Sequence, residues 1–122
     1  MDWAFRPDVP IYTQLVERLT QTIVSGGLAA GERMPSVRDL ALEAGVNPNT
    51  VQRALAELER SGLVYSQRTA GRFVTEDAER IAREREQMAR RRAEDFLDAM
   101  AQLGCGAEQS IALLQEIKEE RH

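Results

Sequence analysis

Residues 34–62, MPSVRDLALEAGVNPNTVQRALAELERSG, have the pattern of two short helices joined by a tight turn. Ser36 can cap the first helix, because its side-chain oxygen can accept a hydrogen bond from a free amide of the first turn. Gly45 can end that helix, because glycine adopts the left-handed conformation without steric cost. The pair Asn47-Pro48 predicts a second helix that runs to about Arg60. Helix, short turn with glycine and helix together indicate a helix-turn-helix.

The second helix has two distinct faces when its residues are spaced at 100°. Its apolar side, which should pack inward, comprises Val51, Ala54, Leu55 and Leu58. Its outer side carries Asn49, Gln52, Arg53, Ala56 and Arg60. Amide and guanidinium groups are those that pair with base edges and phosphates. An isolated helix of this kind would be interpreted as an ordinary amphipathic helix, but its neighbours along the chain favour DNA recognition.

The segment that follows, residues 63–75, predicts a β-hairpin. Two short runs rich in β-branched and aromatic residues flank a break that contains Gly71. A helix-turn-helix followed directly by a hairpin is the plan of a winged helix. Arg68 and Arg72 flank the tip, where a wing would meet the DNA backbone or the minor groove.

The N-terminal part should form an arm and one helix. Pro10 begins a helix that is expected to run to about Ser25, because apolar residues recur at helical spacing. Trp3 and Phe5 alternate along the preceding arm, so both should lie on one side of it and pack on the body or on a partner subunit. A ligand-stacking role for Trp3 is the alternative.

The C-terminal part is expected to be two helices with an uncovered apolar stripe. A long helix should begin after residues 76–78 and reach Leu103, followed by a hinge at residues 104–106 and a last helix from Ala107 to about Arg121. One helix projecting from a small domain cannot bury its own stripe, so a second copy of the chain is the expected partner. The predicted dimerisation residues are Ala89, Ala93, Phe96, Met100, Leu103, Ile111, Leu114 and Ile117. Residues 90–92 are three arginines in a helix rich in glutamate, which favours a solvated face with ion pairs over a second DNA site.

Charge is distributed unevenly along the 122 residues. The formal net charge is −4, yet residues 1–75 carry eight arginines against eight acidic residues, and the excess of acid lies in residues 76–122. A local basic patch matters more for phosphate binding than the total charge. No apolar run approaches the roughly 18 residues of a membrane helix and no signal-peptide pattern is present, so a cytoplasmic location is expected.

No constellation for catalysis or metal binding is found. Cys105 is the only cysteine and His122, the last residue, is the only histidine, so neither a Cys–His pair nor a zinc cluster is expected. The glycines lack the phosphate-binding pattern that would indicate a nucleotide. We therefore predict a protein that is not an enzyme and has no cofactor.

The motifs in combination resemble those of GntR-type bacterial transcription regulators, especially the short YtrA-like branch. The matching stretches are residues 10–15 (PIYTQL), 31–41 (GERMPSVRDLA), 46–51 (VNPNTV), 54–55, 58–59 and 62–63. The resemblance is close over about residues 8–76. It implies a mainly α fold with a small β-hairpin wing, in which residues 1–75 form a winged helix-turn-helix DNA-binding domain and residues 76–122 a two-helix dimerisation tail.

The resemblance also implies a function and a set of contacts. The chain is expected to be a sequence-specific regulator, a repressor that binds a palindromic DNA operator as a homodimer; an effector bound between subunits is left open. The implied DNA-binding residues are Ser36, Arg38, Asn47, Asn49, Thr50, Gln52, Arg53, Arg68, Gly71 and Arg72. Many relatives with larger effector domains carry arginines where this chain has Pro48 and Gln52. The alternative function is a dimeric winged-helix adaptor that binds another protein, but such a surface would more often carry apolar anchors.

Overall fold

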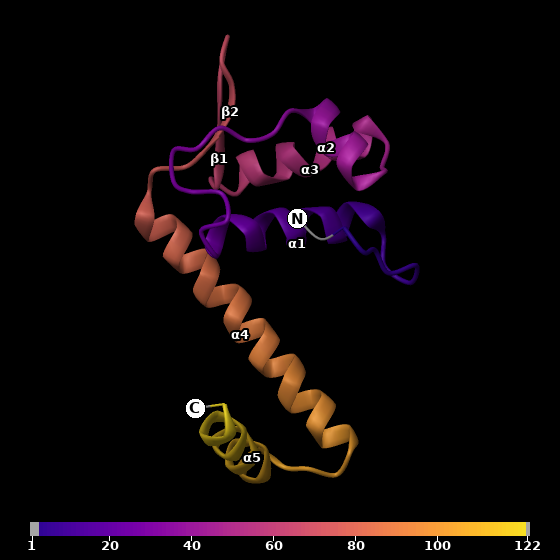
Figure 1. The fold of residues 1–122 in the computed structure, drawn as a ribbon, viewed down its shortest axis with the longest axis vertical. Helices are drawn as coiled ribbons and strands as arrows, with labels where there is room; N and C mark the ends of the chain where they lie inside the picture. The colour runs from indigo at the N-terminus through magenta and orange to yellow at the C-terminus, as the bar shows by residue number, and fades with distance from the viewer. Residues whose placement is uncertain (1–2, 122) are drawn as a thin grey trace. The chain divides into compact units, whose positions relative to one another are not determined.

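The computed structural model describes residues 3–121, which divide into two compact units with the boundary between Arg85 and Glu86. The elements follow the chain as α1 (Ile11–Val24), α2 (Val37–Ala44), α3 (Pro48–Arg60), β1 (Val64–Gln67), β2 (Gly71–Val74), α4 (Ala78–Gln102) and α5 (Ala107–Glu120) (Figure 1). The fold is mainly α with a two-stranded hairpin, which confirms the predicted winged helix-turn-helix followed by two C-terminal helices.

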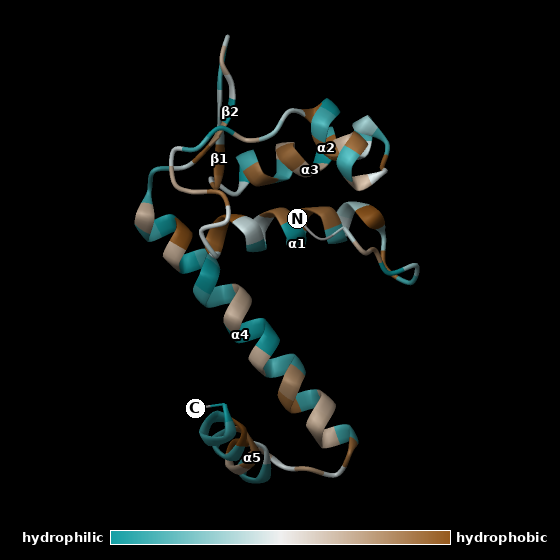
Figure 2. Ribbon diagram, in the orientation of Figure 1, coloured by the Kyte–Doolittle hydropathy of each residue, from teal (hydrophilic) through white to brown (hydrophobic). Residues whose placement is uncertain are grey.

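Helices α1, α2 and α3 form the core of the first unit. Figure 2 shows hydrophobic residues on the sides of α1 and α3 that meet. Leu15 and Leu19 of α1 and Leu55 of α3 are completely buried. Other buried apolar side chains include Ile23, Leu40, Val51, Ala54, Leu58, Leu63 and Val74. The apolar face predicted for the second helix of the helix-turn-helix is therefore the face that packs inward.

The hairpin is antiparallel and short. Val64 pairs with Val74 and Gln67 pairs with Gly71, which leaves residues 68–70 as the loop. Gly71 has φ +99°, a left-handed conformation that glycine adopts freely. A turn followed by a left-handed glycine is a common way to close a three-residue hairpin loop.

The connector between α1 and α2 is held along the hairpin by backbone hydrogen bonds. Its backbone runs along the free edge of β2: Gly31 N–H donates to Val74 O at 3.0 Å and Val74 N–H donates to Glu32 O at 2.8 Å. Met34 N–H donates to Arg72 O at 2.8 Å, and Arg33 forms a bridge with Phe73. The connector thus covers the hydrogen-bonding groups that an edge strand would leave open.

The beginning of α4 belongs to the first unit. Arg80 Nε donates to Ser61 O at 2.7 Å, and Arg85 Nε donates to Val24 O at 2.8 Å. Ile81 is buried, with 8% of its surface exposed. These contacts tie the first two turns of α4 to the end of α1 and the end of α3.

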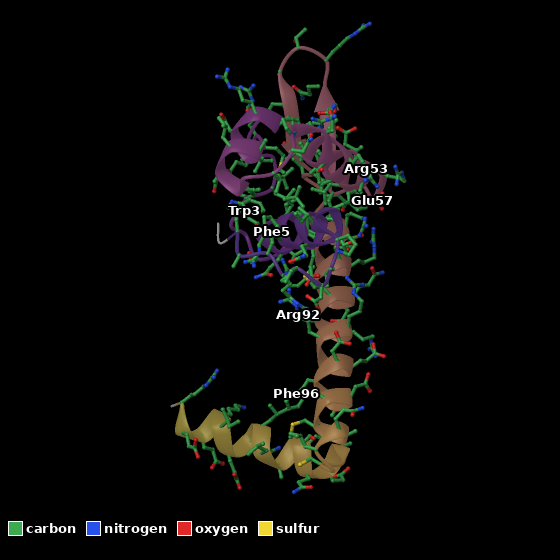
Figure 3. The ribbon with its side chains drawn as sticks, turned by 90° about the vertical axis from the view of Figure 1, so that its right-hand side faces the viewer. Trp3, Phe5, Arg53, Glu57, Arg92 and Phe96 are labelled. Carbon is green, nitrogen blue, oxygen red and sulfur yellow. The ribbon has the colours of Figure 1, made fainter. Side chains whose placement is uncertain are left out.

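The second unit holds the rest of α4, a turn and α5. Gly104 has φ +82° and ends α4, and Gly106 precedes α5. Figure 3 shows α5 leaving the end of α4 sideways rather than running back along it. Large apolar side chains in this unit stay exposed, among them Leu103 (76%), Ile111 (48%) and Leu114 (47%).

Candidate nucleic-acid interface

The outer face of α3 presents polar side chains at its N-terminal end. Asn49, Gln52 and Arg53 are exposed, whereas Val51 on the opposite side is completely buried. Thr50 is half-buried at the margin between the two faces. The arrangement brings an amide, a second amide and a guanidinium to one surface within the first two turns, as the sequence predicted.

Side-chain caps fix the start of each helix of the pair. Ser36 Oγ accepts a hydrogen bond from Asp39 N–H at 3.0 Å, and Asn47 Oδ1 accepts one from Asn49 N–H at 2.8 Å. Gly45 ends α2 with φ +69°. The side-chain oxygens of Ser36 and Asn47 are therefore committed to positioning the helices, and direct contact of these two residues with DNA stays a prediction.

Arg53 has a partner within the protein that the sequence did not reveal. Its Cζ lies 4.2 Å from the centre of the Tyr12 ring, at the start of α1. A guanidinium this close to the face of an aromatic ring is attracted by the ring's negative charge distribution. Figure 3 shows Arg53 and Glu57 on the same side of α3. Tyr12 thus gives Arg53 a defined resting position beside the exposed face of α3.

Arg72 also has a partner. Its Nε lies 2.6 Å from Glu59 Oε1, and the same carboxylate accepts a hydrogen bond from the hydroxyl of Ser66. These two hydrogen bonds, that of Ser66 first, lower the pKa of Glu59 below its ordinary value. Glu59 therefore ties both strands of the wing to α3, and the predicted contact of Arg72 with DNA stays a prediction.

The remaining predicted contacts lie on exposed loops and turns. Arg68 is exposed in the hairpin loop, Gly71 follows it at the start of β2, and Arg38 is exposed in the first turn of α2. Arg38 and Arg68 belong to the same compact unit as the exposed face of α3.

Three residues that sequence reasoning did not assign take part in this surface: Tyr12, Arg33 and Glu59. Tyr12 and Glu59 hold predicted contact residues, and Arg33 lies beside the wing. A helical projection places Glu59 toward one edge of α3, but its pairing with a residue 13 positions later depends on the tertiary structure. Tyr12 and Arg33 lie within the family-like stretches 10–15 and 31–41, but no local pattern shows which side chains the three residues contact.

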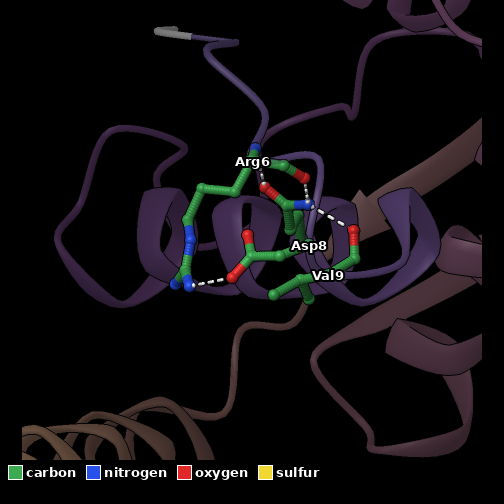
Figure 4. Close-up of polar contacts among 4 residues, drawn as sticks. Arg6, Asp8 and Val9 are labelled. Atoms are coloured by element: carbon green, nitrogen blue, oxygen red, sulfur yellow. Dashed lines mark hydrogen bonds and ion pairs between the residues drawn. The ribbon is translucent and has the colours of Figure 1, made fainter.

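Gln14 of α1 binds the N-terminal arm through three hydrogen bonds. Gln14 Oε1 accepts a hydrogen bond from Arg6 N–H at 2.7 Å, and Gln14 Nε2 donates to the carbonyl oxygens of Arg6 and Val9 (Figure 4). Trp3 Nε1 donates to Glu43 Oε1 of α2 at 3.0 Å, so the aromatic arm packs on the body of the chain. A hollow of about 240 Å³ lies between the arm and α1. This volume is smaller than the roughly 300 Å³ of most small-molecule sites.

The predicted dimerisation residues lie on α4 and α5 of the second unit. Ala89, Ala93, Leu103, Ile111 and Leu114 are exposed. Phe96, Met100 and Ile117 are half-buried. Within the described part of the chain the apolar stripe is thus only partly covered.

Residues 3–121 contain no group of three or more acidic, cysteine or histidine side chains that could hold a metal ion. In the same range, no helix has the length and apolar character needed to cross a membrane. His122, the only histidine in the sequence, lies outside the described residues.

Comparison with known proteins places these features in a family. Residues 11–74 match the family described as "Bacterial regulatory proteins, gntR family". The chain is 36% identical over 111 residues to the uncharacterized HTH-type transcriptional regulator YhcF of Bacillus subtilis, a match that covers 91% of this chain and 92% of YhcF. It is 38% identical over 73 residues to the HTH-type transcriptional repressor YtrA of the same organism, covering 60% of this chain and 56% of YtrA.

Solved structures agree with the sequence matches. A GntR family transcriptional regulator from Listeria monocytogenes has a TM-score of 0.84 at 39% identity, covering 92% of this chain and 98% of that one. The DNA-binding domain of AraR, solved in complex with operator ORX1, has a TM-score of 0.57 at 26% identity, covering 62% of this chain and 96% of that one. The chain therefore belongs to the gntR family of DNA-binding bacterial transcription regulators, which are not enzymes, and within it is similar to the short YhcF and YtrA proteins.

Proposed function

We propose that this DNA-binding regulator acts as a homodimeric repressor on a palindromic operator in the cytoplasm. The proposed DNA-binding domain is residues 1–75, and the proposed dimerisation tail is residues 76–122. In this proposal α3 enters the major groove and the β1–β2 hairpin reaches the neighbouring minor groove. The observation that carries it is the exposed polar face of α3, with Asn49, Gln52 and Arg53 opposite a fully buried apolar face.

The groups on α3 fit the chemistry of base recognition. An arginine can donate two hydrogen bonds to guanine and an asparagine or glutamine can pair with adenine, and each such pair discriminates by about 1–3 kcal/mol. Arg38, in α2, and Arg68, in the hairpin loop, are exposed, so both can supply positive charge for phosphates. The AraR complex with its operator supports the use of this fold for DNA binding.

A dimer is proposed because the tail exposes large apolar side chains. Leu103, Ile111 and Leu114 each keep about half or more of their surface exposed. Burying a side chain of this size is worth about 1.5–3 kcal/mol, so a second copy placed against the same stripe would gain several such contributions. A two-fold dimer would present two α3 helices to two half-sites, which requires an operator with matching symmetry.

Repression is proposed because a dimer bound tightly to an operator occludes the DNA that it covers. The printed name of YtrA, a transcriptional repressor that is 38% identical over 73 residues, supports this assignment. A reporter gene under the control of the operator should be expressed more strongly when the protein is absent.

The test uses Phe96→Asp in the full chain. Phe96 is half-buried in the stripe, so a carboxylate there should turn the dimer into a monomer and greatly weaken operator binding. Gln87→Asp is the matched control, because position 87 lies nine residues earlier and therefore on the opposite side of α4. Sedimentation at micromolar concentration and operator binding should both be unchanged in the control. A Phe96→Asp protein that stays dimeric would show that the tail does not form the dimer.

A further inference from the structure

The two faces of the wing differ in whether their arginine is paired with a carboxylate of the same chain. Side chains alternate along a strand, so Ser66 and Arg72 lie on the face toward α3, while Gly71 and Phe73 lie on the outer face. On the face toward α3, Glu59 binds the Arg72 guanidinium, whose side chain is 23% exposed. Much of the positive charge on that face is therefore neutralised within the protein.

Arg33 supplies a cation on the outer face. Arg33 lies in the connector and forms an antiparallel β-bridge with Phe73 of β2. Backbone hydrogen bonds before and after Arg33 hold the connector along β2. Its guanidinium reaches toward the wing tip: a Cβ built on Gly71 would lie 3.3 Å from Arg33 Nε and 3.4 Å from Arg33 Nη2. The absence of a side chain at Gly71 thus provides the space in which the guanidinium lies. Arg33 is exposed.

A hairpin that enters the minor groove has a sugar-phosphate backbone on each side, because that groove is only about 6 Å wide. One strand of DNA would face the Glu59–Arg72 side of the wing, and the other would face the outer side. Arg33 and Arg68 are the exposed arginines that this geometry brings to the outer side and the tip.

We propose that Arg33 binds a DNA phosphate on the outer side of the wing. This inference rests on the proposed function, since it assumes that the wing lies in the minor groove beside α3. Phosphate contacts carry no sequence information, so Arg33 should strengthen binding to every duplex and not select an operator. Gly71 acts indirectly by leaving room for the guanidinium.

The test is the salt dependence of DNA binding by the full chain carrying Arg33→Gln. Affinity for the operator and for a random duplex should fall by a similar factor, and the slope of log affinity against log salt should become shallower by about 0.9, the contribution of one phosphate. Arg33→Lys should keep most of the slope, because a lysine retains the charge. Arg83→Gln is the control, since Arg83 is an exposed arginine on α4, outside the wing and the helix-turn-helix.

Each outcome separates the two proposals. An unchanged slope in Arg33→Gln, or a loss confined to the operator, overturns the phosphate contact while the proposed function stands. A wild-type chain that binds no duplex overturns the proposed function and this inference together. Circular dichroism checks that Arg33→Gln keeps the fold, and Arg33→Lys separates loss of charge from loss of packing.

Discussion

The contact between Arg53 and Tyr12 predicts a measurable coupling between α3 and α1. We would replace Tyr12 by Leu, Arg53 by Gln, and both together. The guanidinium lies 4.2 Å from the ring centre, well inside the roughly 6 Å limit for a cation–π contact. Arg53 is exposed, so the coupling should be at the low end, about 0.5–1 kcal/mol.

Urea unfolding of the four proteins followed by circular dichroism gives the coupling as the departure from additivity. Tyr12→Phe should behave like the wild type, because it keeps the aromatic ring. The control cycle uses Tyr12 with Arg60, which lies seven residues beyond Arg53 and so about 10 Å farther along α3. That pair should be additive within about 0.3–0.5 kcal/mol.

The same cycle measured on operator binding tests what the contact does for recognition. Arg53→Gln should weaken operator binding by about 1–3 kcal/mol if Arg53 pairs with guanine. If the ring positions Arg53 for DNA, Tyr12→Leu should weaken binding in the wild type but have little effect once Arg53 has been removed. A coupling near zero in both unfolding and binding would refute the argument, and would mean that the two side chains meet without mutual stabilisation.

Three further predictions concern the wing, its tip and the core. The hydrogen bonds from Ser66 and Arg72 lower the pKa of Glu59 in the folded chain, so they stabilise the fold fully at pH values above the ordinary pKa of 4.5, and that contribution is lost progressively as the pH falls from 4.5 through the lowered pKa. Glu59→Gln should therefore lower the free energy of unfolding in urea by about 0.5–1 kcal/mol at pH 7, a small effect because the Glu59–Arg72 pair is partly exposed. The difference from wild type should shrink at pH 4. An equal difference at pH 7 and pH 4 would contradict an ionic role for Glu59. Gly71→Ala should destabilise the hairpin by about 1 kcal/mol or more, because φ is +99° and the new Cβ would crowd Arg33, and a thermal melt equal to wild type would oppose this. Leu55→Ala should cost about 2–5 kcal/mol, since Leu55 is completely buried, and a cost below 1 kcal/mol would mean that the core closes around the cavity.

Much of the fold could be predicted from local signals. Caps and glycines mark helix ends through interactions within one turn, which is why the predicted starts at Ser36 and Asn47-Pro48 and the stop at Gly45 are confirmed. The helical spacing of apolar residues also identified the buried face of α3, because residues that recur at this spacing lie on one side of a helix and pack together against the core.

The sequence did not predict which side chains, distant along the chain, contact each other in the fold. Tyr12 and Arg53 are 41 positions apart, and Arg33 approaches Gly71 only because the connector lies along β2. A sequence pattern shows that an arginine lies on a polar face, but it does not show which ring or carboxylate lies across from it. The sequence therefore predicted the surface that carries the candidate site. Only the structure shows which of its arginines are exposed and which are paired with another side chain of the same chain.

Two copies of the chain are proposed to bind a symmetrical DNA site through α3. Hydroxyl-radical footprinting of the full chain on the DNA upstream of its own gene would reveal such a complex. A two-fold dimer should give two protected clusters related by two-fold symmetry and separated by one helical turn, about 34–36 Å, or a multiple of it. Protection should weaken as salt rises. A single protected patch without symmetry, or protection that does not depend on sequence, would show that the chain does not bind as a two-fold dimer to a specific operator.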